Sequence, residues 1–242
     1  MSTLIKIIIA TLLSFSLFSC NFDININSGV RGNGNVKIVE RSLNQPFTSI
    51  KTTEGLDVYL TQGENISLSV EADENLQELI ITEVVDGVLK IHTLKSIGSC
   101  KAKKVMVNFK DITEIKATSG SDVFSTNTIK ANDLVLSTTS GSDMTLNVNT
   151  TNLICKSTSG SDLKISGKTN NLVVETTSGS DFKGENLVAQ SADAKATSGS
   201  DITLNTENKL IAKATSGGDI KYYGNPKIID QSSGSSGSIK KK

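Results

Sequence analysis

The chain has 242 residues, and its 25 Lys and Arg balance its 25 Asp and Glu, so the formal net charge is zero. A neutral chain whose only arginines are Arg31 and Arg41 has no general electrostatic attraction for nucleic acid. One His, three Cys and no Trp also argue against a histidine-based zinc site and against a disulfide-rich scaffold.

The first twenty residues have the pattern of an export signal. Lys6 precedes an apolar run from Ile7 to Phe18, which is short for a membrane span and typical of a secretory signal. The run ends in Leu17-Phe18-Ser19-Cys20, which resembles a bacterial lipobox. We therefore expect a lipoprotein signal peptide over residues 1–19 and lipidation of Cys20. An ordinary signal peptide with an incidental Cys is the alternative.

Lipidation of Cys20 predicts where the protein resides. Acyl chains on Cys20 anchor a protein stably to a bilayer, so we expect a location in the cell envelope, at the outer membrane, facing the periplasm or the outside. Asn21 is not followed by an acidic run, so the membrane and the leaflet stay open. Residues 20–35 are rich in Asn and Gly and predict a flexible tether. A single domain over residues 36–242 is expected to follow.

A short motif recurs through this domain. Thr-Ser-Gly-Ser-Asp, with a second Gly in the last copy, occurs six times between residues 118 and 219, at Asp-to-Asp spacings of 21, 19, 19, 20 and 18 residues. Degenerate copies occupy residues 53–57 and 232–236. A period near 20 residues is typical of a solenoid in which each repeat forms one coil.

Apolar residues alternate with polar ones within each repeat. Around Gly141, one parity holds Leu134, Leu136, Met144, Leu146 and Val148. Strict period two indicates β-strands with the apolar set buried. The sequence therefore predicts an all-β, parallel β-helix-like solenoid of about 18–21 residues per coil, with regular coils from about residue 112. Each coil is strand, Gly-centred bend, strand and loop.

The same alternation predicts that both Ser residues of each bend point inward, where Gly supplies the backbone conformation. Buried hydroxyls must then bond to one another or to the backbone along the stack. The first inward set is Ser119, Ser140, Ser159, Ser178, Ser198 and Ser216, and the second is Ser121, Ser142, Ser161, Ser180 and Ser200.

Two sets of side chains are expected to point outward in straight columns. The first consists of Thr residues, and the second, the Asp column, is the candidate ligand face: Asp122, Asp143, Asp162, Asp181, Asp201 and Asp219. Carboxylates stacked about 4.8 Å apart repel one another unless something compensates them. The main interpretation is that each Asp accepts backbone N–H groups in its own turn. A line of weak cation sites, for example for calcium, is the alternative, although one carboxylate per bend predicts poor affinity.

The N-terminal part is less regular. We expect an entry coil over residues 47–60, strands at 66–70 and 105–109, and a short helix at 73–79. Residues 80–92 predict a hairpin around Asp86-Gly87, a strong turn signal. Antiparallel strands should therefore flank the start of the solenoid, while three terminal lysines oppose edge pairing at its end.

Three further residues invite a chemical interpretation. Cys155 has inward parity, so we expect a buried free thiol, whereas Cys100 lies in a Lys-rich loop. Whether the two pair is left open. His92 falls on a hairpin strand, where a structural or exposed role is more typical than a catalytic one.

Several segments, together with the Ser-Gly-Ser-Asp bends, resemble the head GIN domain family, also called the auto-transporter adhesin family, which is common in Bacteroidetes. They are Gly32–Val36, Gly55–Gly63, Val70–Asn75, Asp86–Ile91 and Tyr222–Lys227. The resemblance implies a right-handed parallel β-helix-like fold in a cell-envelope lipoprotein. It implies adhesion by name only, and it carries no catalytic residues.

Taken together, these features predict a non-catalytic envelope lipoprotein that acts as an adhesin or surface-binding module. The alternative is a structural or assembly protein whose solenoid ends or faces form oligomers. A polysaccharide-active enzyme is less favoured, because such enzymes cluster carboxylates in a cleft. The expected partners are a membrane, through the lipid, and a polysaccharide or an envelope protein, with no nucleic acid. No cofactor is expected beyond weakly bound calcium.

Overall fold

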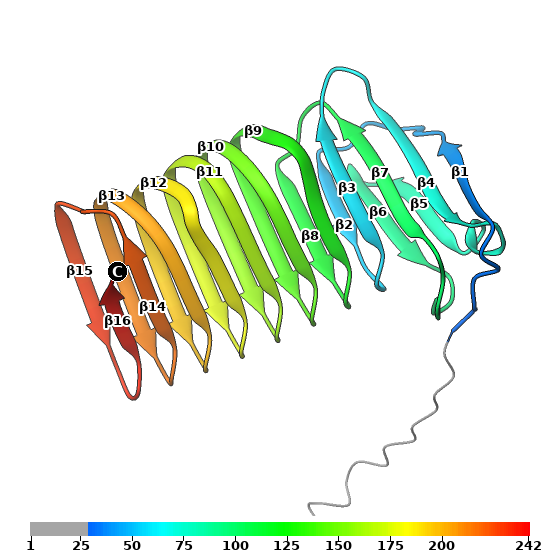
Figure 1. Ribbon diagram of the computed structural model, residues 1–242. Coiled ribbons are helices and arrows are strands. Elements are labelled where there is room, and N and C mark those ends of the chain that lie inside the picture. Colours follow the sequence, from blue (N-terminus) through cyan, green and yellow to red (C-terminus); the bar gives the residue numbers. More distant parts are fainter. Residues whose placement is uncertain (1–28) are drawn as a thin grey trace, which may run out of the picture.

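The computed structural model describes residues 29–242, so the predicted signal peptide, Cys20 and the start of the tether lie outside the described residues. The predicted all-β solenoid is confirmed, with about seven turns and antiparallel strands at its N-terminal end (Figure 1). Within residues 29–242 no helix has the length and apolarity needed to span a bilayer.

Two β-faces enclose one core. The first face has the strand order β1-β4-β7-β3-β9-β10-β11-β12-β13-β14-β16, and the second contains β5, β6, β2 and β8, the C-terminal halves of β9 to β13, and β15. The strands before the regular coils are β1 (Val36–Arg41), β2 (Ser49–Thr52), β3 (Asp57–Gln62), β4 (Ser67–Asp73), β5 (Ile80–Val85), β6 (Val88–Thr93), β7 (Lys103–Phe109) and β8 (Glu114–Thr118). The coils and the C-terminal end comprise β9 (Asp122–Thr139), β10 (Asp143–Thr158), β11 (Asp162–Thr177), β12 (Asp181–Thr197), β13 (Asp201–Thr215), β14 (Asp219–Tyr223), β15 (Ile228–Ser233) and β16 (Ser238–Lys241).

Successive coils stack in parallel, with equivalent residues side by side. Asp143 pairs with Asp162, and Leu153 pairs with Leu172. The coils differ in length, and the differences are absorbed by register shifts on the edge opposite the Ser-Gly turns, such as the one between Lys164 and Gly167. Registration is therefore kept at the turns and relaxed at the far edge.

The Ser-Gly turns correct one prediction about their side chains. Ser119 and Gly120 both have positive φ, 56° and 71°, as in the type I′ turns of β-hairpins. Two consecutive left-handed residues interrupt the alternation, so the first Ser of each bend is exposed and its inward assignment is wrong. The second set is confirmed, because each of its side chains is fully buried: Ser121, Ser142, Ser161, Ser180 and Ser200.

The last, degenerate copy of the motif is displaced by two residues from the predicted position. Ser238 pairs with Asp219, and Ser236 has the positive φ of the turn Gly in the other copies. The turn therefore corresponds to residues 234–238 instead of 232–236. Here Ser238 replaces the Asp of the other copies.

The N-terminal strands follow the predicted pattern, with one difference. The hairpin is confirmed by β5 and β6, joined by Asp86 and Gly87, which both have positive φ. The expected helix at residues 73–79 is only a single 3-10 turn, Glu74–Leu76. Three residues are too few for the apolar periodicity that stabilises an α-helix.

Residues 30–35 are not a free tether. Val30 forms a β-bridge with Ile97, and the Gly34 N–H donates to Asp73 Oδ2 at 2.7 Å. The Asp73 side chain is buried, and its Oδ1 also accepts the N–H groups of Lys101 and Ala102, each at 3.0 Å. Asp73 thus joins the incoming chain to the start of β7. Burial opposes its ionisation, but the bonds from Gly34, Ala102 and Lys101 outweigh burial and lower the pKa of Asp73.

We predict that the hydrogen bonds of Asp73 to residues 34, 101 and 102 weaken in acid. Because the folded pKa of Asp73 lies below its unfolded value, its contribution to stability is complete above about pH 4 and is lost as the pH falls through the folded pKa. Asp73→Asn should lower the urea midpoint at pH 7 and flatten the dependence of stability on pH below about 4. Asp230→Asn, on exposed β15, is the control. An unchanged midpoint for Asp73→Asn at pH 7 would contradict this role.

A second prediction concerns the turn conformation. Ser159 has φ 59°, a region that β-branched residues adopt only at a cost. Ser159→Val should therefore destabilise the protein by about 1–2 kcal/mol, measured by urea denaturation. Ser159→Asn is the matched control, because Asn-Gly is favoured in type I′ turns, and it should retain or raise stability. Equal losses in both variants would show that the left-handed conformation is not the cause.

Candidate functional site

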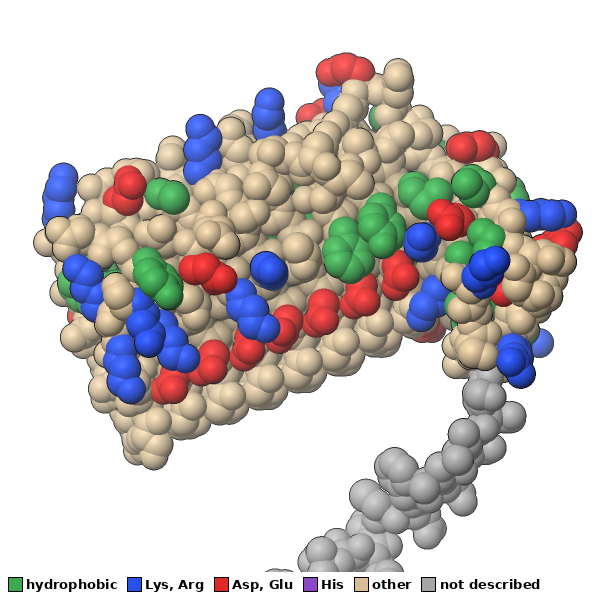
Figure 2. All heavy atoms as spheres, viewed as in Figure 1, with side chains coloured by type: hydrophobic (Ala, Val, Ile, Leu, Met, Phe, Trp, Pro, Cys, Tyr) green, Lys and Arg blue, Asp and Glu red, His purple; other side chains and the backbone are tan. Residues whose placement is uncertain are grey.

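The six predicted Asp residues form one outward column along the first face. Register places Asp143 beside Asp122 and Asp162, and the pairing continues through Asp181, Asp201 and Asp219. Figure 2 shows these carboxylates as a straight row along the solenoid. The column is longer than predicted, because Asp57 of β3 pairs with Asp122. The degenerate motif at residues 53–57 already contained the signal for Asp57.

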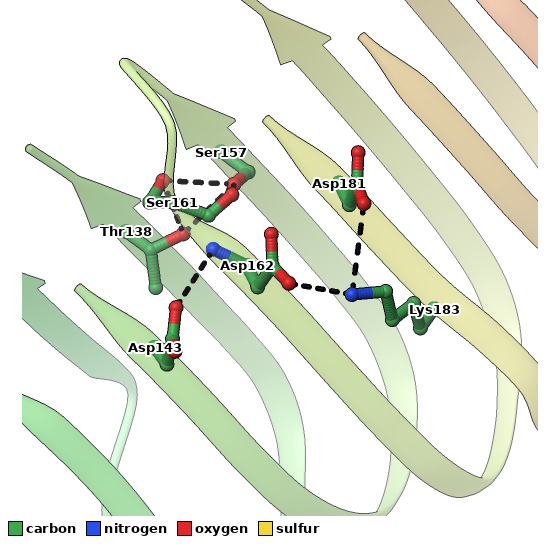
Figure 3. Close-up of polar contacts among 7 residues, drawn as sticks. All are labelled: Thr138, Asp143, Ser157, Ser161, Asp162, Asp181 and Lys183. Atoms are coloured by element: carbon green, nitrogen blue, oxygen red, sulfur yellow. Dashed lines mark hydrogen bonds and ion pairs between the residues drawn. The ribbon is translucent and has the colours of Figure 1, made fainter. Parts of the chain in front are cut away.

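Among the described residues, no column carboxylate accepts a hydrogen bond from within its own turn. The prediction that each Asp binds the backbone N–H groups of its own turn is therefore wrong. Asp143 Oδ1 instead accepts the backbone N–H of Asp162, in the next coil, at 3.2 Å (Figure 3). The Asp162 N–H also donates to the Ser142 carbonyl at 3.2 Å, and the Asp143 N–H donates to the Ser121 carbonyl at 3.1 Å. The type I′ turn leads directly into a strand, so the nearest donor to Asp143 belongs to the neighbouring coil.

Lysine compensates the column in one place. Lys183 Nζ lies 2.5 Å from Asp162 Oδ2 and 3.6 Å from Asp181 Oδ2 (Figure 3). The hydrogen bond to Asp162 raises the pKa of Lys183. Lys183 therefore screens two neighbouring carboxylates of the column.

Burial and like charge act together on the column near its N-terminal end. Burial, followed by the charges of Asp143 and Asp57, raises the pKa of Asp122, against the opposing charge of Lys103. No lysine forms an ion pair with Asp122 among the described residues. Burial and repulsion therefore outweigh Lys103 at this position.

The geometry gives the calcium alternative little support. Within residues 29–242, no group of three or more His, Cys, Asp or Glu residues is placed to hold a metal ion. Calcium binds six to eight oxygen ligands, whereas each coil supplies one column carboxylate.

An aromatic pair beside the column was missed by sequence analysis. Tyr59 and Phe124 stack on the outer surface with ring centroids 5.2 Å apart. They occupy the outward position two residues after Asp57 and Asp122, and register pairs them directly. The same outward position holds Thr145, Lys164 and Lys183 in later coils. Counting two residues beyond each Asp would have found this mixed aromatic and basic column.

Inside the turns, buried hydroxyls form the expected network. The Thr138 hydroxyl donates to Ser157 Oγ at 3.0 Å, and Ser157 donates to the Ser161 carbonyl at 2.7 Å (Figure 3). The Ser161 hydroxyl lies 3.1 Å from Thr138 Oγ1. In each bend, the second Ser also accepts the N–H of the Thr that opens the turn, as Ser142 does from Thr139 at 3.1 Å. The predicted bonding along the stack is confirmed.

The remaining chemical candidates are dispersed. Cys155 is a buried free thiol, as predicted, and burial raises its pKa. Cys100 is also free and partly buried. His92 Nε2 lies 3.6 Å from Glu83 Oε1 on the β5–β6 hairpin, away from the Asp column.

The comparisons with known proteins agree with this geometry. The family model described as "Putative auto-transporter adhesin, head GIN domain" matches residues 46–226. The chain belongs to this family. The resemblance found in the sequence is therefore confirmed, and none of the curated proteins matches the chain.

Solved structures resemble this head GIN domain in fold. A putative adhesin from Bacteroides fragilis has 20% identity and a TM-score of 0.81, covering 88% of this chain and 100% of its own. A putative adhesin from Parabacteroides merdae has 18% identity and a TM-score of 0.72, covering 88% and 98%. A putative lipid binding protein from Parabacteroides distasonis has 22% identity and a TM-score of 0.70, covering 88% and 99%. At these identities the likeness shows the shared fold.

We predict that removing the charge of Asp122 from the column stabilises the protein. Because the folded pKa of Asp122 is raised, its ionised form opposes folding at neutral pH. Asp122→Asn retains the acceptor oxygen and should add about 0.5 kcal/mol after solvent screening, measured by thermal or urea unfolding at pH 7. The gain should shrink as the pH falls through the raised pKa. Asp162→Asn, which loses the Lys183 ion pair, should give no gain, and a loss in Asp122→Asn would contradict the repulsion.

Proposed function

We propose that the protein is a non-catalytic adhesin of the cell envelope, anchored by lipid on Cys20, that binds a polymer or another surface through its repetitive faces. The observation that most supports this proposal is the straight Asp column, held in register from Asp57 to Asp219. A ligand with a regular repeat can meet the same group at each coil, so many weak contacts add up. Membership of a family described as an adhesin supports the proposal.

The distribution of carboxylates supports a binding role over catalysis. Glycoside hydrolysis places two carboxyl groups on either side of a bond held in a cleft. The column carboxylates lie one per coil on an outer face, and the larger grooves of residues 29–242 are lined by other residues. A column of carboxylates beside hydroxyl, lysine and aromatic groups suits hydroxyl-rich glycans or a basic protein surface.

The fold suggests how the binding faces are presented. The described chain enters beside the antiparallel strands, and the coils lead away from that end (Figure 1). With a lipid on Cys20, the antiparallel strands lie nearest the bilayer and the coils extend from it. The adhesin family favours a surface or envelope location, and the outer membrane is part of the proposal.

An assembly role is the second candidate, and the C-terminal end favours it. Among the strands of residues 29–242, β15 pairs only with β13 and β16 only with β14, so each presents an edge that no described strand covers. Ile228 and Ile229 are 60% and 46% exposed there. Free strand edges with apolar side chains are potential pairing surfaces. Sedimentation at increasing protein concentration separates this role from a monomeric adhesin.

The test is binding of the purified protein to a glycan and envelope-polysaccharide array, with and without calcium. We expect a saturable signal that falls when Asp143→Asn and Asp162→Asn are combined. The control is Asp193→Asn, which removes an exposed carboxylate from the second face. Binding that survives the double variant moves the ligand away from the Asp column. A well-folded protein without any glycan signal contradicts glycan adhesion and favours a protein partner or assembly.

A further inference from the structure

The edge opposite the Ser-Gly turns carries a groove that the proposed function does not use. The groove has a volume of about 1200 Å³ and crosses four successive coils, where β9, β10, β11 and β12 bend from the first face to the second. It is separated from the Asp column by the width of the first face. Asp111 lies at its N-terminal end and Gln190 at the other.

The side chains that flank the groove are bonded to one another. On the first face, Thr128 donates to Asn147 Oδ1 at 2.7 Å, and Asn147 Nδ2 donates to Ser166 at 3.0 Å. The second face carries a matching ladder: Asn152 Nδ2 donates to Asp133, and Asn171 Nδ2 donates to Asn152 Oδ1, both at 2.8 Å. These ladders use their hydrogen-bonding groups internally and stiffen both rims.

The amides between the two ladders have no such partners. Asn132, Asn149 and Asn170 line the groove, and none of their side chains bonds to another described residue. Each amide offers two donors and an acceptor to a ligand. The floor of the groove therefore presents amides that bond to no described side chain, between two rims whose polar groups are already hydrogen-bonded.

A glycine brings two coils close together at the centre of the groove. Gly167 stands in register with Val148, and Val148 with Ile129, both of which are buried. Gly167 has φ 109°, and a Cβ there would lie 2.0 Å from the Val148 carbonyl oxygen. The absence of a side chain at this corner therefore lets β11 approach the backbone of β10 closely, where any Cβ would strike the Val148 carbonyl.

Two lysines set the charge of the groove. Lys130 pairs in register with Asn149, and Asn149 pairs with Lys168. The lysines are thus two coils apart, about 10 Å at the spacing of parallel strands. Both are exposed, line the groove, and take part in no ion pair with a described residue. Among the described residues, Asp111 is the one acidic residue of the lining, and Asp133 on the rim carries a second carboxylate.

We infer that this groove is a second binding site, for an acidic polysaccharide that carries an anionic group on every second sugar. The rise of one coil is close to the length of one sugar in an extended chain, so two coils match a disaccharide. Lys130 and Lys168 then meet successive anionic groups, and Asn149 meets the neutral sugar between them. The amides of Asn132 and Asn170 bond to hydroxyl groups along the chain. Such a polymer is repelled by the Asp column, so the two sites take different ligands.

The test measures binding of three soluble polymers to the purified protein at low and physiological salt. Hyaluronan has a carboxylate on every second sugar, polygalacturonate on every sugar, and dextran on none. We expect hyaluronan to bind most tightly, with affinity falling as salt rises. Combining Lys130→Gln with Lys168→Gln should weaken its binding about tenfold or more. Combining Lys195→Gln with Lys213→Gln, which changes the same charge on the second face, should leave it unchanged.

Each alternative outcome overturns the inference. An equal loss of hyaluronan affinity in both double-lysine variants indicates nonspecific charge attraction. Binding of polygalacturonate as tight as that of hyaluronan contradicts recognition through the two-coil spacing of the lysines. Absence of hyaluronan binding in a folded protein removes the site. The Asp143→Asn and Asp162→Asn double variant should still bind hyaluronan, so failure of the Asp column as an adhesive face and failure of this groove are separately visible.

Discussion

The structure depends on the parallel register between successive coils, and that register is set at the Ser-Gly turns. Two consecutive left-handed residues reverse the chain in minimal space, and the following Ser closes the turn from inside. The turns also bond to one another, since Gly141 N–H donates to the Ser159 carbonyl at 3.2 Å. One edge of the solenoid is thereby held constant while coils of different length adjust at the other.

The parallel register both stabilises and destabilises the solenoid. It places identical side chains side by side, which forms the bonded ladders of Asn152 and Asn171 but also stacks the Asp column. Two groups offset this repulsion: the Asp162 N–H, which donates to Asp143, and Lys183. At Asp122, burial and the charges of Asp143 and Asp57 raise the pKa. Faces that repeat along the axis are the property on which both proposed binding sites depend.

The two ends of the solenoid are built differently. At the N-terminal end, β1, β4 and β5 pair antiparallel and the buried Asp73 joins residues 30–35 to the domain. Arg41 contributes to this closure by donating to the Gln77 carbonyl at 2.6 Å. At the C-terminal end, β15 and β16 leave free edges near a cluster of lysines. Like charges oppose pairing between copies at the β16 edge, whereas the β15 edge carries the exposed Ile228 and Ile229.

The sequence by itself determined the repeat, the strands, the buried parity of residues such as Leu153 and Cys155, and six of the seven members of the Asp column, because alternation and turn composition are local properties of the chain. Only the tertiary structure decided that Ser119 faces solvent, that Asp143 bonds to the next coil and that residues 30–35 pack on the domain. It also brought Asp57 beside Asp122 and Lys130 two coils from Lys168. These contacts join residues that are distant in sequence. They are set by the stacking of the coils, about which the alternation along one strand carries no information.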